Sequence, residues 1–386
     1  MRWGWRGELG GIRPVAAGLA LAALFGLAPA AMAQSAAPAP PAYGEPSEND
    51  FVIRDFHFRS GESLGELRIH YTTLGTPARD AAGRITNAVL ILHGTGGSGH
   101  QFLRPQFAGE LFGPGQLLDS QRYFIILPDD IGHGRSSKPS DGMRMRFPRY
   151  DYADMVDAEH RLVTERLGIS RLRLIMGTSM GCMHSFMWGE MYPQAMDALM
   201  PLACAPVPII GRNRLWRRMV IDAIENDPAW RGGDYTAEPL AGLRAAEDIQ
   251  IIAGSAPQQL QKTLTSQTEV DKYLKHYMDL DLGGPGADPT TLLDANDLIY
   301  QVDSSRDYDP SANLEAIEAP MIWINSADDF INPPELGIPE REASRLKLGR
   351  FVLLPIGPNT HGHGTHTWAV AWKGYLYELL EKTGPP

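Results

Sequence analysis

The hydrophobic positions of this chain form short continuous runs that alternate with longer stretches of mixed polarity. Between and after the runs, apolar residues at helical spacing predict helices over 152–167, 180–192 and 366–380. The runs are rich in branched residues and cover 89–92, 123–127, 172–176, 198–202, 321–324 and 351–354. Continuous apolar strands separated by helices predict an α/β fold, with a mostly parallel sheet covered by helices on both faces.

Two other patterns complete the predicted organisation. Residues 51–58 and 67–73 suit an antiparallel edge at the start of the sheet. From 206 to 319 no apolar strand run occurs, and the segment is helical, charged and aromatic, as in "RNRLWRRMVIDAIENDPAW". We therefore predict a core made of 51–205 and 320–386, with an inserted, mostly helical cap at 206–319 over the carboxyl ends of the strands.

The first 33 residues read as a cleaved export signal. Three arginines precede an apolar stretch over 15–27, and Ala31-Met32-Ala33 offers a small-residue cleavage site before Gln34. The apolar stretch is too short for a membrane span. The Ala/Pro-rich residues that follow predict a disordered linker at 34–50. We expect an exported protein, periplasmic or secreted, without a membrane span.

Charge and cysteine content narrow the function classes. The net charge of the whole chain is −11, and removal of the signal segment makes it more negative, so nucleic acid is not an expected partner. Cys182 and Cys204 are the two cysteines, so disulfides do not build the fold. The sequence favours two buried thiols, and a single bridge between them is the alternative that an oxidising compartment would permit.

The strongest chemical motif is Gly177-Thr178-Ser179-Met180-Gly181. This G-x-S-x-G directly follows one apolar run and directly precedes a predicted helix. That context is typical of a nucleophile elbow, in which a sharp strand-to-helix turn exposes a serine hydroxyl above the sheet. Ser179 is therefore the predicted nucleophile, and a serine that merely caps the helix is the alternative.

A serine nucleophile needs a base and a group that orients the base. The acid should end a late strand, where "MIWINSADDFINPPE" offers Asp328 and Asp329, and we favour Asp329. The base should follow the last strand, where "GPNTHGHGTHTW" offers His361, His363 and His366. We favour His363, because glycines on both sides let it reach over the elbow.

The three histidines also raise a metal alternative. Their H-x-H-x-x-H spacing copies the ligand spacing of a dinuclear zinc hydrolase loop. In that loop an aspartate precedes the last histidine, whereas Thr365 stands there in this chain. We expect no metal and no cofactor.

The stretch "HGTGG" at 93–97 follows an early apolar run and leaves the backbone bare. A tetrahedral intermediate needs backbone N–H donors at its oxyanion, and bulky side chains there would block the substrate. The N–H after the nucleophile, on Met180, is one predicted donor. Thr95 is the predicted second donor.

Four arginines at the start of the predicted cap could meet a substrate carboxylate. They are Arg212, Arg214, Arg217 and Arg218. A solvated helix face is the interpretation that the sequence favours for them.

These residues resemble the α/β-hydrolase superfamily, and within it the homoserine O-acetyltransferase-like branch. The resemblance rests on "LRIHYTTLGTP", "NAVLILHGTGGSG", "QRYFIILPDDIG", "ADMVDAEHRLVTERLGISRLRLIMGTSMGCMHSFMWGEMYP", "IDAIENDPAWRGGDY" and "GHGTH". It implies the same triad of Ser179, Asp329 and His363, and a possible homodimer. The chain departs from the branch's transferases at "DDIGHGRSSKPS", where they carry Asn-x-x-Gly-Gly-Cys-x-Gly-Ser-Thr-Gly-Pro, and at "GTSMGCMH", where their elbow tends to read Gly-Gly-Ser-Met-Gly-Gly-Met-Gln.

We therefore expect a serine hydrolase that cleaves a small-molecule carboxylic ester, or an amide or lactone, through an acyl-enzyme. The two motif departures and the expected export favour water as the acyl acceptor. One alternative is an acyltransferase of the homoserine O-acetyltransferase type, which differs only in the second attacking group. The other is a non-catalytic binding protein on the same fold.

Overall fold

The computed structural model describes residues 41–284 and 292–384. The expected signal segment at 1–33 lies outside the described residues. Eight strands form one sheet in the order β1-β2-β4-β3-β5-β6-β7-β8. Their bounds are β1 Ser47–His57, β2 Ser63–Leu74, β3 Ala88–Leu92, β4 Phe124–Pro128, β5 Leu174–Thr178, β6 Leu199–Leu202, β7 Met321–Ser326 and β8 Gly349–Leu354.

The pairing follows the predicted mixture of an antiparallel edge and a parallel body. β1 pairs antiparallel with β2, and β2 pairs antiparallel with β4. The strands from β4 through β8 are parallel to one another. Because parallel strands need crossover connections, helices lie between them in sequence, and the predicted α/β class is confirmed.

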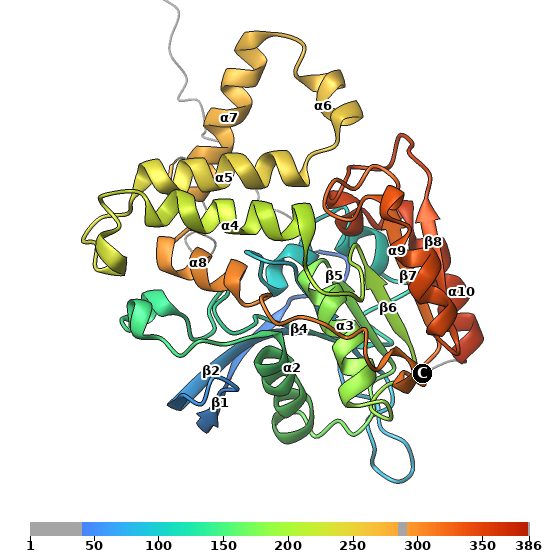
Figure 1. Cartoon of the computed structure of the whole chain (residues 1–386). Helices are drawn as coiled ribbons and strands as arrows, with labels where there is room; N and C mark the ends of the chain where they lie inside the picture. Colours follow the sequence, from blue (N-terminus) through green and yellow to red (C-terminus); the bar gives the residue numbers. More distant parts are fainter. Residues whose placement is uncertain (1–40, 285–291, 385–386) are drawn as a thin grey trace, which may run out of the picture. The chain divides into compact units, whose positions relative to one another are not determined.

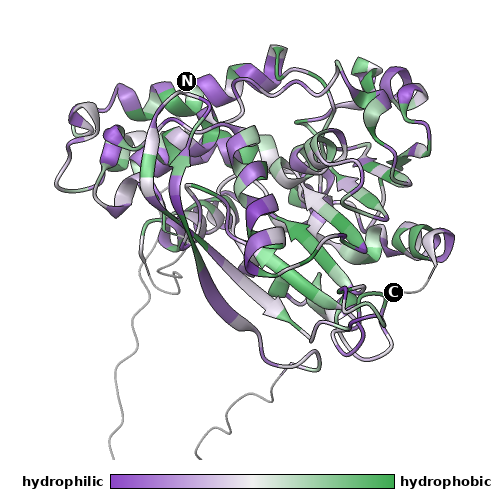
Figure 2. Cartoon of the chain, turned by 90° about the horizontal axis from the view of Figure 1, so that it is seen from below, coloured by the Kyte–Doolittle hydropathy of each residue, from purple (hydrophilic) through white to green (hydrophobic). Residues whose placement is uncertain are grey.

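Alternate residues of the central strands enter two separate hydrophobic clusters, one on each face of the sheet. In β3, Leu90 and Leu92 pack on one face, whereas Val89 and Ile91 pack on the other. All four side chains are fully buried, which explains why the sequence shows a continuous apolar run and no alternation. Figure 2 shows the strands in the middle of the sheet as hydrophobic along their length.

The helices cover both faces. α2 (Tyr152–Arg161) and α3 (Met180–Met191) contribute to one cluster, and α1 (Ala108–Leu111) and α10 (Lys373–Thr383) contribute to the other. α9 (Ile338–Glu342) is short and lies between β7 and β8 in sequence. Figure 1 shows α2 and α3 on the near face, with α10 beside β8.

Three local expectations need correction. The linker expected at 34–50 is ordered at its end, because Ser47–Asp50 belong to β1, where their backbone pairs with β2. The helix expected over 152–167 changes to a π-type turn after Arg161. The C-terminal helix begins at Lys373 rather than at residue 366, since 3₁₀ turns occupy Gly364–Thr367 and Ala369–Ala371.

The segment between β6 and β7 is helical, and its described residues include no strand of the sheet. Its helices are α4 Gly211–Glu225, α5 Leu240–Gly254, α6 Pro257–Thr263, α7 Gln267–Asp281 and α8 Ala295–Asp303. α5 and α8 each pack on α4 around a hydrophobic cluster that includes Val220, Leu243 and Leu298. Figure 1 shows α4 and α5 side by side, with α8 beneath α4. The exact division at 206 and 319 stays a prediction.

Cys182 and Cys204 form a disulfide, so the favoured interpretation of two free thiols is wrong. Cys182 lies in the first turn of α3 and Cys204 lies just after β6, and their Cα atoms are 5.8 Å apart. β5 and β6 are neighbours in the sheet, so the topology brings the two cysteines together. In the described part of the chain, no helix is long and apolar enough to cross a bilayer.

Candidate active site

Ser179 occupies a sharp turn between β5 and α3. Its φ is 54° and its ψ is −108°, a backbone conformation that residues other than glycine rarely adopt. A methyl group on Gly177 would lie 1.9 Å from the Gly181 carbonyl oxygen, and one on Gly181 would lie 2.2 Å from the Leu92 carbonyl oxygen. Both glycines of the motif are therefore required by close packing of backbone around the serine.

His363 lies after β8 and reaches the serine from the far end of the sequence. Its Nε2 is 2.8 Å from the Ser179 Oγ, and its Nδ1 is 2.9 Å from the Asp329 Oδ2. Only 9% of His363 is exposed. The structure thus brings the three residues predicted as a triad into one hydrogen-bonded chain.

Asp329 is buried and receives several hydrogen bonds besides that of His363. The backbone N–H groups of Ile331 and Asn332 donate to its Oδ1 at 2.8 and 3.1 Å, and the Asn332 side chain donates to its Oδ2 at 3.0 Å. Burial alone would raise the pKa of Asp329, but the His363 imidazole and these hydrogen bonds outweigh it and hold the pKa below its ordinary value. The carboxylate is therefore charged and faces the histidine.

The rejected candidates have other contacts. Asp328 accepts a hydrogen bond from the Ser326 hydroxyl, and His361 stacks on the Trp368 ring. His366 is half-buried, with its ring 5.2 Å from that of His363, and desolvation followed by the proximity of His363 lowers its pKa to about 3. Both ring nitrogens of His363 are engaged by Ser179 and Asp329, which leaves the three histidines unsuited to a shared metal.

The loop after β3 lies against the nucleophile. A methyl group on Gly94 would lie 3.3 Å from the Ser179 Cβ and 3.8 Å from its Oγ. The His93 Nε2 accepts from the Asp130 N–H, so its Nδ1 carries the proton and donates to the Gly94 carbonyl at 2.8 Å. The Gly97 N–H donates to the same carbonyl at 2.9 Å. These two bonds fix the direction of the Gly94 carbonyl.

The two predicted oxyanion donors are the N–H groups of Met180 and Thr95. Met180 is the first residue of α3, so its N–H has no acceptor within the helix. In the described residues, no acceptor is paired with the N–H of Met180 or of Thr95. The N–H that follows Met180 is already paired, since Gly181 donates to the His93 carbonyl at 2.9 Å.

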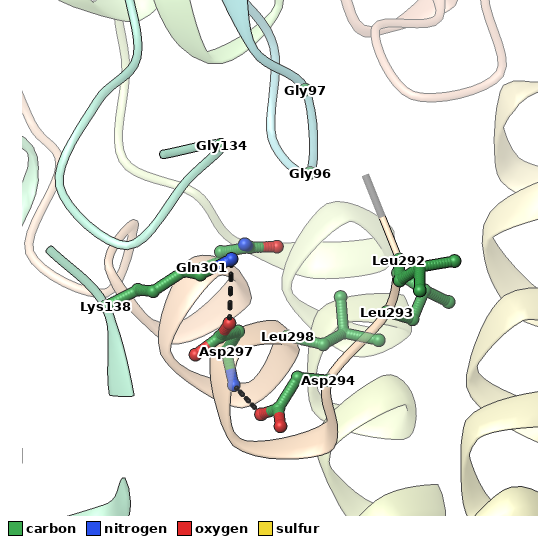
Figure 3. A pocket seen from close by; sticks show the side chains of 10 residues that line it. All are labelled: Gly96, Gly97, Gly134, Lys138, Leu292, Leu293, Asp294, Asp297, Leu298 and Gln301. Atoms are coloured by element: carbon green, nitrogen blue, oxygen red, sulfur yellow. Dashed lines mark hydrogen bonds and ion pairs between the residues drawn. The ribbon is translucent and has the colours of Figure 1, made fainter. Parts of the chain in front are cut away.

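A pocket adjoins this loop, and sequence reasoning did not find it. It lies between the Gly96–Gly97 turn and α8 (Figure 3). Its polar side chains are Lys138, Asp294, Asp297 and Gln301. No periodicity or motif connects α8 with a loop some 200 positions earlier, so only the fold could reveal this contact.

A second missed feature is a buried cluster of titratable groups behind the loop. Glu159 accepts from the His184 Nδ1 at 2.7 Å and from the Trp188 indole at 2.5 Å, while the Asp130 carboxylate oxygens have no hydrogen-bond partner in the described residues. Burial raises the pKa of Asp130 well above its ordinary value and raises that of Glu159 to about 7. Burial thus shifts both carboxyl groups toward their protonated forms.

The arginines at the start of α4 do not share one environment. Arg217 is only 3% exposed, and it donates to the Asn213 side chain at 3.0 Å and to the Ser305 hydroxyl at 3.2 Å. The expectation of a solvated face is therefore wrong for Arg217, although Arg218 pairs with Asp222 and Glu225 at the surface.

A cavity of about 820 Å³ lies beside this end of α4. Met183, Ile210, Arg212 and Asn332 are among its lining residues. Its lining includes neither Ser179 nor His363. It therefore adjoins the Asp329 loop and does not open directly on the nucleophile.

The fold and the geometry of these residues define an α/β-hydrolase. The sequence profile of the alpha/beta hydrolase fold matches residues 87–344, and the chain belongs to this family. Within the family, a homoserine O-acetyltransferase that is 31% identical to it over most of its length places it in the homoserine O-acetyltransferase-like branch. The resemblance inferred from the motifs is thereby confirmed.

Two relatives match most of the chain. A homoserine O-acetyltransferase from Pelobacter propionicus is 31% identical over 356 residues, covering 82% of this chain and 91% of its own. A probable acyltransferase from Methanothermobacter thermautotrophicus is 31% identical over 287 residues, covering 74% of this chain and 84% of its own.

Solved structures of transferases and esterases share the fold. A homoserine O-acetyltransferase from Bacillus anthracis is similar with a TM-score of 0.72 at 21% identity, covering 86% of this chain and 97% of that chain. An acetylester hydrolase from Corynebacterium glutamicum is similar with a TM-score of 0.73 at 21% identity, covering 87% and 96%. At this identity the likeness concerns the fold alone.

Proposed function

We propose that this protein transfers an acyl group through an acyl-enzyme formed on Ser179. The observation that carries the proposal is the hydrogen-bonded chain from the Ser179 hydroxyl through both nitrogens of His363 to the buried Asp329 carboxylate. A neutral imidazole in this position can accept the serine proton, and the carboxylate fixes the tautomer that makes it possible.

In the first half-reaction, the His363 Nε2 takes the hydroxyl proton while the Ser179 Oγ attacks the carbonyl carbon. The carbonyl oxygen becomes an oxyanion next to the N–H groups of Thr95 and Met180. The intermediate collapses when His363 gives its proton to the leaving oxygen, which releases an alcohol and leaves the acyl group on the serine. Asp329 stays ionised throughout and stabilises the imidazolium.

The second half-reaction needs an acceptor that His363 deprotonates. The names of the relatives support an alcohol acceptor, as in an acyltransferase, more than the water that the sequence departures favoured. Hydrolysis of a small carboxylic ester is the second candidate, and the fold shared with acetylester hydrolase supports it. Both candidates use the same acyl-enzyme.

The test is to acylate the purified protein with p-nitrophenyl acetate and to measure how the acyl group partitions between water and alcohols. A transferase would give acetylated alcohol as the main product at millimolar alcohol, and a hydrolase would give acetate. Ser179→Ala should lose both products and labelling by a fluorophosphonate. Labelling of the Ala variant at the wild-type rate would contradict the proposal.

We also propose export to the periplasm or the medium. The disulfide between Cys182 and Cys204 supports it, because such bonds persist in oxidising compartments. Mass spectrometry of the protein recovered from a bacterial periplasm should find a mature N-terminus at Gln34. An N-terminus that retains residues 1–33 would contradict cleavage.

A further inference from the structure

The pocket described above lies beside the oxyanion loop, the segment Gly94–Gly97 that carries the predicted donor Thr95. No predicted role accounts for its size and its lining. Its volume is about 20 Å³, which is room for one water-sized group. Gly96 and Gly97 form one wall, and Leu298 and Gln301 of α8 form the opposite wall (Figure 3). The pocket therefore suits a small substituent of a substrate rather than a whole ring.

Gln301 contributes a hydrogen-bond acceptor. Its Nε2 donates to the Gly132 carbonyl at 2.7 Å. Because a carbonyl oxygen can only accept, the NH2 end of the Gln301 amide must face Gly132. The other end, Oε1, accepts no hydrogen bond from the described residues, although Gln301 is only 8% exposed. A methyl group on Gly96 would lie 3.9 Å from this oxygen. The oxygen thus faces the wall formed by the oxyanion loop.

Lys138 contributes a hydrogen-bond donor. Its ammonium has one close carboxylate oxygen, the Asp297 Oδ2 at 3.8 Å, which is beyond hydrogen-bond distance. Its side chain is 23% exposed, and its Nζ donates no hydrogen bond to the described residues. Figure 3 shows Lys138 reaching toward Asp297 beneath the loop. Its three N–H donors remain available to a bound molecule.

The two carboxylates of the pocket are already committed. The Asp297 oxygens accept from the Ser140 N–H and hydroxyl at 2.8 and 2.6 Å, and the Asp294 Oδ1 accepts from two N–H groups at the start of α8. A carboxylate on the substrate would lie beside two carboxyl groups that offer it no free hydrogen-bond donor, whereas an ammonium would meet the like charge of Lys138. A neutral hydroxyl, which both donates and accepts, matches Gln301 and Lys138 together.

We propose that this pocket binds a hydroxyl group of the substrate, so that the enzyme selects esters or acyl acceptors that carry a second hydroxyl. The inference rests on the proposed acyl transfer at Ser179. The loop from Gly94 to Gly97 separates the serine from the pocket, and three residues span at most about 10 Å. The second hydroxyl should therefore be separated from the reacting carbon by a short carbon chain.

The experiment compares matched pairs that differ only by a terminal hydroxyl. One arm uses α,ω-diols of three to six carbons against n-alcohols as acyl acceptors, and the other uses p-nitrophenyl ω-hydroxyalkanoates against alkanoates of equal length. The two arms distinguish a hydroxyl on the alcohol from one on the acyl group. We expect a preference of at least about tenfold in kcat/KM for the hydroxylated member in one arm.

Lys138→Met and Gln301→Met should each reduce this ratio to within about twofold of one. They lie in separate segments, so that one remains informative if the other does not fold. Lys275→Met, which removes an exposed lysine of α7, is the matched control and should leave the ratio unchanged. A wild-type ratio near one in both arms, or a ratio that both folded variants retain, would overturn the inference. Turnover of p-nitrophenyl acetate and fluorophosphonate labelling report on the proposed acyl transfer separately.

Discussion

Substitution of Asp329 by asparagine should disable His363 as the base while residue 329 keeps its backbone hydrogen bonds. The Oδ1 of the new side chain can still accept from the Ile331 and Asn332 N–H groups. In place of Oδ2, however, an NH2 group would face two donors, the His363 Nδ1 and the Asn332 side chain. The imidazole relieves this conflict by moving its proton to Nε2, which then faces the Ser179 hydroxyl and cannot accept its proton.

The expected loss in kcat for p-nitrophenyl acetate is about 10³- to 10⁴-fold, equivalent to about 4 to 5.5 kcal/mol of transition-state stabilisation. Asp328→Asn is the matched control, because the Asp328 carboxylate is adjacent in sequence but contacts Ser326 and not His363. It should change kcat by less than about threefold. Calorimetry would verify that both variants fold. A folded Asp329→Asn protein with more than a tenth of wild-type kcat, or a large loss in Asp328→Asn alone, would refute the assignment.

Three further predictions concern the loop after β3, His366 and the disulfide. Gly94→Ala places a methyl group 3.8 Å from the Ser179 Oγ and should lower kcat/KM by about 10- to 100-fold. Gly109→Ala, which has open space around it, should not lower it. Equal kcat/KM values for the two variants would contradict the close approach of Gly94 to the serine. His366 has a lowered pKa, so the unfolded state takes up its proton first, and the free energy of unfolding should fall as pH drops below about 6.5. The same titration of His366→Gln should show a smaller fall, and an identical pH profile would be evidence against it. The bridge from Cys182 to Cys204 closes a loop with a sequence separation of 22 and should contribute about 3 kcal/mol, measured by denaturant unfolding with and without reductant; a Cys182→Ser/Cys204→Ser protein should not respond to reductant, and a wild type that does not respond either would contradict the bridge.

Most of the fold was predictable because it depends on local sequence patterns. Each of the six apolar runs overlaps a strand of the sheet, and the antiparallel edge includes most of the predicted segments 51–58 and 67–73. The errors lie at boundaries. Ser47–Asp50 are polar yet belong to β1, because the backbone of β2 extends far enough to pair with them, and pairing of that kind leaves no trace in hydropathy.

The disulfide and the environment of Arg217 show a different limit. Cys182 and Cys204 lie 22 residues apart, and only the neighbouring positions of β5 and β6 bring them within bonding distance. Arg217 belongs to a run of charged residues typical of a solvated helix face, yet the packing of α4 against Ser305, just after α8, buries it. Neither the pairing of the two cysteines nor the contact of Arg217 with Ser305 can be predicted from composition or periodicity.

The topology explains why the candidate triad was readable while the adjoining pocket was not. β3, β5, β7 and β8 are parallel members of one sheet, so the residues that follow them must meet at a single edge. Gly94, Ser179, Asp329 and His363 all follow such strands, and motif order was enough to assign them. α8 follows no strand of the sheet directly. Its Gln301 donates to the Gly132 carbonyl in the loop after β4 and lines the same pocket as Gly96 and Gly97. The candidate catalytic residues therefore lie at strand ends that motif order locates, whereas the proposed hydroxyl pocket depends on the packing of α8, which the sequence alone does not specify.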